Sequence, residues 1–145
     1  MNRELENLII EESWTVAKGK RKDKPLLARI NLGLKPLVGD SRYPHWFGIA
    51  IQLKSPNKDG FPSPEESSQL AEIEDMIANA LQKDNQSLFA AVLTANGIRE
   101  FVFYTSDPEA AKARLAVVAA EIDTYEKIGR AVKPDADWTI YRRFI

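Results

Sequence analysis

Apolar residues recur along this chain with two periods, one of two residues and one of three to four, and these predict strands and helices respectively. Residues 88–105 read LFAAVLTANGIREFVFYT, which is two apolar runs around an Asn96-Gly97 turn. This is the strongest short-range signal for a β-hairpin. We therefore predict strands at residues 87–94 and 98–105. The first is apolar on both faces, which is typical of a central strand covered on both sides.

Two helices are predicted, one before and one after this hairpin. Each opens with a capping residue followed by proline and glutamate: Ser63 in SPEE, where Glu66 would complete a capping box, and Asp107 in DPEA. Apolar residues then recur at helical spacing, as a stripe that faces the core: Leu70, Ile73, Ile77 and Leu81 in the first helix, and Ala111, Leu115, Val118 and Ile122 in the second. The first helix should end near residues 84–85, with Glu74 and Ala78 away from the core.

Alternation of apolar and polar residues predicts five further strands, at residues 13–20, 26–34, 46–54, 124–133 and 138–145. The basic segment 20–25 reads as a hairpin loop, and residues 35–44, which contain two prolines, a glycine and an aspartate, read as a longer loop. Residues 1–12 are predicted as a short helix or an irregular lead-in.

The order of these elements predicts an α+β fold with a ferredoxin-like βαββαβ core. Its antiparallel sheet would be extended by an N-terminal β-hairpin and by a C-terminal strand, with helices on one side only. The 145 residues are enough for one domain with its own core, and no linker divides them, so residues 1–145 are predicted as a single domain.

The amino-acid composition makes several classes of function and of location less plausible for this chain. The net charge of −1 gives no global basic field that would favour nucleic acid, and the absence of cysteine excludes disulfides, thiolate chemistry and cysteine-based zinc sites. The start of the chain lacks the basic and long apolar regions of a signal peptide, and no stretch approaches the roughly 18 apolar residues of a membrane span. We therefore expect a cytoplasmic protein without a membrane partner.

No arrangement of residues in the sequence indicates catalysis. His45 is the only histidine, and a catalytic zinc site usually needs two or three. The carboxylates of the first predicted helix fit its N-terminus or a solvated face: Glu65, Glu66, Glu72, Glu74 and Asp75. The basic run KGKRKDK at residues 18–24 fits a solvated loop. We assign no catalytic residue, metal or cofactor. Whether the protein is an enzyme stays open, and the interpretation without enzymatic activity is favoured.

The strand IREFVFYT raises the possibility of an RNA-binding sheet. Phe101, Val102 and Tyr104 match the end of the aromatic pattern found in RNA-recognition modules, but Arg99 and Glu100 replace its upstream aromatic and small positions. Core packing is the favoured interpretation of the phenylalanines in this strand, so we expect no nucleic-acid partner.

Four polar residues occupy interior positions of predicted strands, where a buried polar group needs a partner: Arg29, Asn31, Arg99 and Arg130. One interpretation is that they line a binding pocket on the sheet face away from the helices. The other is that they form a solvated sheet face. The sequence leaves both open.

Several spaced motifs resemble the bacterial domain of unknown function 695. They are an early tryptophan (Trp14), an R-x-N pair (Arg29 and Asn31), and DGFPSPEE at residues 59–66 with IEDMI at 73–77. TANGIREFVFYT at residues 94–105 and a closing D-W-x-x-Y (Asp137, Trp138 and Tyr141) complete the set. The resemblance covers nearly the whole chain. That family has no established activity, so no catalytic residues are carried over. Some relatives carry the domain beside one similar to a ribonuclease E regulator, itself a protein-binding module.

The leading hypothesis is a non-enzymatic protein-interaction or regulatory module, which could pair with a second copy through a sheet face or edge. The rival is a small-anion or metabolite-binding protein, or an enzyme, that uses a polar sheet-face pocket built by Arg29, Asn31 and Arg99. RNA binding through the sheet is the third. A pocket walled by polar groups would favour the second hypothesis, and a flat apolar patch the first.

Overall fold

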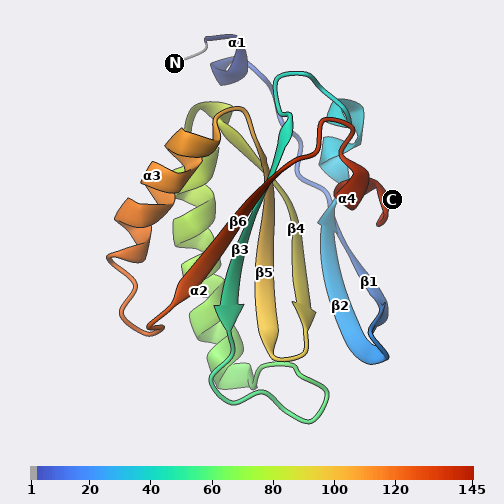
Figure 1. The fold of residues 1–145 in the computed structure, drawn as a ribbon, viewed down its shortest axis with the longest axis vertical. Helices are drawn as coiled ribbons and strands as arrows, with labels where there is room; N and C mark the ends of the chain where they lie inside the picture. Colours follow the sequence, from blue (N-terminus) through green and yellow to red (C-terminus); the bar gives the residue numbers. More distant parts are fainter. Residues whose placement is uncertain (1–2) are drawn as a thin grey trace.

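A computed structural model describes residues 3–145 as one six-stranded sheet with helices on both faces (Figure 1). The strand order is β1-β2-β4-β5-β3-β6, and all neighbours are antiparallel. The strands are β1 (Trp14–Arg21), β2 (Lys24–Asn31), β3 (His45–Gln52), β4 (Ser87–Ala95), β5 (Ile98–Thr105) and β6 (Ile128–Pro134). The helices are α1 (Arg3–Glu6), α2 (Pro64–Gln82), α3 (Pro108–Ala119) and α4 (Thr139–Arg142), with 3₁₀ helices η1 (Leu32–Leu37) and η2 (Lys83–Asn85).

The predicted central hairpin is confirmed. Asn96 and Gly97 both have positive φ, as a tight turn requires, and Ala95 pairs with Ile98 across it. β4 is buried along its whole length, as its double apolar face indicated. None of the helices in residues 3–145 combines the length and apolarity needed to cross a membrane. Of the lead-in predicted at residues 1–12, residues 1 and 2 lie outside the described part.

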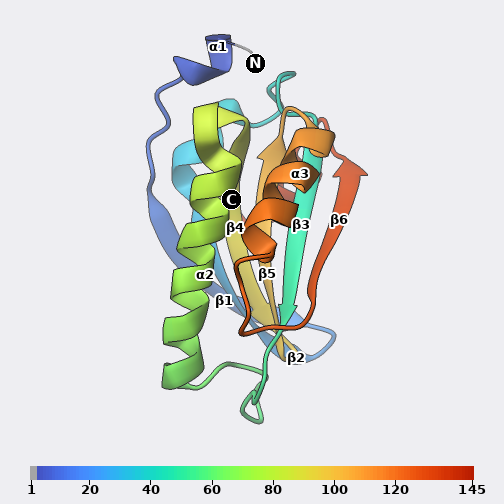
Figure 2. The same cartoon turned by 90° about the vertical axis from the view of Figure 1, so that its left-hand side faces the viewer.

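Helices α2 and α3 lie side by side on one face of the sheet (Figure 2). Their predicted apolar stripes pack there against alternate residues of the three central strands, among them Phe47, Ile49, Phe101 and Phe103. The prediction that Glu74 and Ala78 lie away from the core is wrong. Ala78 is buried and Glu74 bonds to β2, because Trp14 and Arg29 of β1 and β2 reach under α2 on that side.

The opposite face is also covered, so the predictions of helices on one side only and of a C-terminal strand are both wrong. The Asp135 carboxylate accepts hydrogen bonds from the amides of Thr139 (2.8 Å) and Ile140 (3.1 Å), which starts the helical turn α4 instead of a strand. Trp138 then stacks on Tyr104 with ring centroids 4.1 Å apart. The predicted strand at residues 26–34 likewise ends at Asn31, whose side chain caps η1 through the Gly33 amide.

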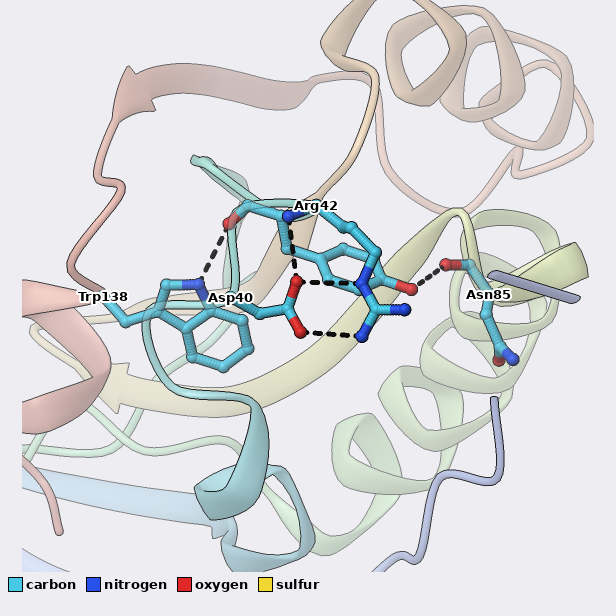
Figure 3. Close-up of polar contacts among 5 residues, drawn as sticks. Asp40, Arg42, Asn85 and Trp138 are labelled. Atoms are coloured by element: carbon cyan, nitrogen blue, oxygen red, sulfur yellow. Dashed lines mark hydrogen bonds and ion pairs between the residues drawn. The ribbon is translucent and has the colours of Figure 1, made fainter. Parts of the chain in front are cut away.

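The loop before β3 is fixed to this cover by side-chain bonds (Figure 3). Asp40 accepts from the Arg42 guanidinium at 2.8 and 2.9 Å. The Trp138 indole N–H donates to the Tyr43 carbonyl at 2.9 Å, and the Tyr43 hydroxyl donates to the Asn85 carbonyl at 2.6 Å. The loop thus joins the C-terminal segment to the end of α2.

Trp46 of β3 lies flat over the backbone of Gly48 on the same face. A Cβ added to Gly48 would overlap the far edge of the Trp46 ring, whereas a Cβ on Gly19 of edge strand β1 would meet nothing within 4 Å. The indole is in turn covered by the Lys133 ammonium, 5.0 Å from the ring centroid. Glycine at position 48 is therefore a packing requirement.

We expect Gly48→Ala to lower the free energy of unfolding by about 2 kcal/mol, because the large Trp46 ring must move from a filled site. Gly19→Ala is the matched control and should stay within about 0.5 kcal/mol of the parent. Urea denaturation measures both, and equal unfolding midpoints for the two variants would contradict this packing.

The Ser63 side chain accepts a hydrogen bond from the Glu66 amide at 3.1 Å, which confirms the predicted N-cap of α2. We expect Ser63→Ala to lower the free energy of unfolding by about 1 kcal/mol. Ser68→Ala, one turn further along α2, removes only a 3.3 Å bond to a helix carbonyl and should leave the stability close to that of the parent. Urea denaturation that finds no difference between the two variants would place the start of the helix elsewhere.

Candidate functional site

The four polar strand residues do not form a pocket on the face away from α2 and α3. Arg29 pairs in register with Val92, and Arg130 with Ile49, both of which face α2 and α3. Directly opposed residues of antiparallel strands share a face, so these side chains belong to the helix-covered side. Arg99 alternates with Phe101 on that same side. The expected placement is therefore wrong, because the register of β2 turns the apolar residues of that strand to the other face.

Arg29 is engaged in an ion pair with α2. Its Nη1 and Nη2 donate to the two carboxylate oxygens of Glu74 at 2.8 and 2.9 Å, and its guanidinium lies 5.2 Å from the Trp14 ring centroid. The hydrogen bonds that Arg29 donates to Glu74 raise the pKa of Arg29, against the opposing effect of burial. With its charge balanced by a bidentate partner, Arg29 offers little to a ligand anion.

Asn31 is buried and bonded on both sides of its amide group. Its Nδ2 donates to the Phe89 carbonyl at 3.1 Å, and its Oδ1 accepts from the amides of Ser13 and Gly33, each at 3.1 Å. It therefore holds together β4, the approach to β1 and the start of η1. This is a structural role that leaves no free polar atom for a ligand.

Arg99 lies between two acidic groups under α2. Its Nε donates to the Thr94 hydroxyl at 3.0 Å, and the charges of Glu74 and Glu66 act on it in opposition to that of Arg29. Burial is the largest influence and lowers the pKa of Arg99. Among the described residues it forms no ion pair as close as that of Arg29.

Glu66, one of the acidic groups that act on Arg99, is a buried carboxylate that the sequence interpretation missed. Glu66 is only 5% exposed; its Oε2 accepts from the Lys54 amide at 2.8 Å and from the Tyr125 hydroxyl at 2.5 Å. The predicted capping box is thus half right, since Ser63 caps the helix but the Glu66 side chain turns inward. No local signal distinguishes the two arrangements, because Tyr125 is 59 residues away and enters from the segment before β6. That segment was predicted as strand, but the strand starts only at Ile128.

The pKa values of Glu66 and Tyr125 are both shifted in directions that do not suit proton transfer near neutral pH. Burial acts to raise the pKa of Glu66, but the hydrogen bonds from Tyr125 and from the amides of Lys54 and Ser55, with the Lys54 charge, together hold it below its ordinary value. Burial and the bond to Glu66 raise the pKa of Tyr125. An effective acid–base catalyst has its pKa near the working pH, and both groups are moved away from it. Nor do three or more histidine or carboxylate groups among the described residues gather as metal ligands.

A groove lies between α3 and β6, with Arg130 in its lining. Its volume is about 590 Å³, and α3 and β6 each contribute apolar residues and one cation to its lining. The apolar residues are Leu115, Ala116, Ala119, Ile128 and Val132, and the cations are Lys112 and Arg130. Arg130 forms no hydrogen bond or ion pair with any described residue. Arg130 therefore combines a place in the lining of this groove with a charge that has no partner among the described residues.

This groove runs along an unpaired edge of the sheet, because within residues 3–145 β6 pairs only with β3. The Asp135 amide donates to the Pro44 carbonyl, and hydrogen-bonded pairs alternate along an antiparallel ladder. Gly129, Ala131 and Lys133 therefore direct their backbone groups toward β3. The intervening residues, Ile128, Arg130 and Val132, direct theirs outward, and Pro134 follows at the next outward position, where a missing N–H costs no ladder bond.

The lowered pKa of Glu66 predicts an acid-dependent loss of stability. A carboxyl whose pKa is lower in the folded than in the unfolded state stabilises the fold above its unfolded pKa, and that stabilisation is lost as the pH falls through its folded pKa. We expect Glu66→Gln to be less stable than the parent at pH 7, with the difference shrinking below about pH 4. Urea midpoints across this pH range measure it. Two parallel profiles would contradict an ionised Glu66 in the fold.

Sequence comparison identifies one family. The family of unknown function DUF695 matches residues 12–145, from just before β1 to the last residue. Comparison with curated proteins and with solved structures gives no match. The matched stretch includes Arg29, Asn31, the hairpin and the C-terminal cover described above. The chain therefore belongs to the family of unknown function DUF695.

Proposed function

We propose that this domain is a non-enzymatic protein-binding module, and that it takes up an extended segment of a partner protein along β6. The single observation that carries the proposal is the position of the α3–β6 groove beside a strand with outward backbone groups. A segment that adds a strand to such an edge gains main-chain hydrogen bonds from the edge and side-chain contacts from the groove.

The shape of the groove supports an extended partner over a small molecule. Sites for small ligands are concave and enclose most of the ligand surface. α3 lies beside the edge strand β6 (Figure 2). The groove is lined by residues of these two elements and is open on the outer side of β6. The alternative of a small anion held by Arg29, Asn31 and Arg99 lacks such support, because Arg29 and Asn31 are already satisfied by protein groups.

We further propose a ferredoxin-like core for the fold. Taken in chain order, β3, α2, β4, β5, α3 and β6 form a βαββαβ series whose strands lie in the order β4-β5-β3-β6. The fourth strand of that series is then the edge that we assign to binding, and the β1–β2 hairpin extends the sheet at the opposite side. Because folds of this kind host many functions, the proposal depends on the groove and not on the topology.

Selection from a library of displayed random peptides, followed by synthesis of the enriched sequences, tests the proposed function. We expect the bound peptide to shift the NMR signals of β6 and α3. Arg130→Pro should bind at least about tenfold more weakly than Arg130→Ala, because both lose the charge and only the proline loses an outward N–H.

Val16→Pro is the matched control on the opposite edge. The Leu32 amide donates to the Ser13 carbonyl, so alternation also directs the Val16 amide outward from β1. We expect this variant to bind like the parent. Equal binding by Arg130→Pro and Arg130→Ala, both shown to be folded by thermal unfolding, would rule out strand addition at β6.

A further inference from the structure

We infer that the segment bound at β6 is acidic at its centre and apolar two residues to either side, in the pattern apolar-x-(Asp or Glu)-x-apolar. The inference rests on the proposed function and specifies the chemistry of its partner. Three features of the groove support it: the outward backbone positions of β6, the unpartnered Arg130 charge and the apolar residues that α3 contributes to the lining.

The backbone of β6 fixes which side chains of an added strand enter the groove. An antiparallel strand would exchange hydrogen bonds with the outward residues Ile128, Arg130 and Val132. Residues directly opposite each other share a face, and these three face α3, since Ile128, Arg130 and Val132 pair with Ile51, Ile49 and Phe47 of the helix-side core. Every second side chain of the bound segment therefore enters the groove.

Charge selects the central position. Arg130 is exposed and has no partner among the described residues, so an opposing carboxylate would gain a cross-strand ion pair. Lys112 adds a second cation to the groove. Among the described residues its only ion pair is with Glu109 at 3.1 Å, and that carboxylate is 83% exposed and easily released. A basic residue at the same place would meet two like charges.

Apolar contact selects the flanking positions. A side chain opposite Ile128 or Val132 would lie against that residue and against the apolar side of α3, formed by Leu115, Ala116 and Ala119. Ile128 and Val132 are half-buried in the free protein, with part of each surface open to the groove. Burial of this surface by β-branched side chains would add to the main-chain bonds.

Charge also disfavours a second copy of this chain as the occupant. If two β6 strands paired antiparallel about Arg130, the two Arg130 side chains would oppose each other in the same groove-facing row. Like charges directly opposite each other destabilise a strand pair. Lysine and arginine on an edge are a known means of preventing association between identical sheets.

Three synthetic peptides test the pattern: TVTETVT, its charge-reversed form TVTKTVT, and TTVEVTT, which has the composition of the first but places valine at the alternate positions. We expect TVTETVT to bind the parent protein about tenfold more tightly than either of the other two, measured by NMR titration. Arg130→Glu should lose or reverse the preference for the acidic over the basic peptide, while thermal unfolding shows that it remains folded.

The outcomes separate this inference from the proposed function. Equal binding of the three peptides, with Arg130→Pro still weaker than Arg130→Ala, would overturn the pattern and leave strand addition intact. A preference for TVTETVT that persists in Arg130→Glu would also overturn it. If none of the three peptides shifts the NMR signals of β6, the pattern is wrong. If sedimentation shows a dimer that Arg130→Pro dissociates, the binding of a foreign segment at this edge is wrong as well.

Discussion

The stacking of Trp138 on Tyr104 is the contact on which the second half of the structure depends. It fastens the C-terminal segment to the sheet face that α2 and α3 leave open, and hydrogen bonds extend it in both directions. The Tyr104 hydroxyl donates to Asp135 at 2.8 Å, and the Tyr141 hydroxyl donates to the Asn31 carbonyl at 2.6 Å. Trp138 is held with φ of 55°, which a bulky residue adopts only where packing compensates the strain.

Closing this face determines where a partner can bind. With α2 and α3 on one side and the C-terminal segment, η1 and α1 on the other, the central strands are buried on both faces. In the part of the chain that the structure describes, the two edge strands of the sheet are β1 and β6. Both strands carry lysine and arginine, which discourages pairing with identical edges, but the groove that α3 forms with β6 gives that edge side-chain selectivity as well.

Local signals in the sequence predicted most of the elements, and long-range contacts account for what they missed. The Asn96-Gly97 turn and the caps Ser63 and Asp107 depend on neighbouring residues alone, and all three were predicted correctly. The alternating tail WTIYRRFI predicted a strand, yet its conformation depends on Asp135 and on Tyr104. Arg130 was a candidate from its position in a strand, but only the packing of α3 beside β6 shows that a groove adjoins it.

Amide hydrogen exchange along β6, followed by NMR on the free protein, tests the central claim most directly. If β6 is an open edge, the outward amides of Arg130 and Val132 should exchange at least about tenfold faster than the inward amides of Ala131 and Lys133, which bond to β3. Uniform protection of all four amides would contradict the account, because it would mean that the edge is already paired and cannot accept a partner segment.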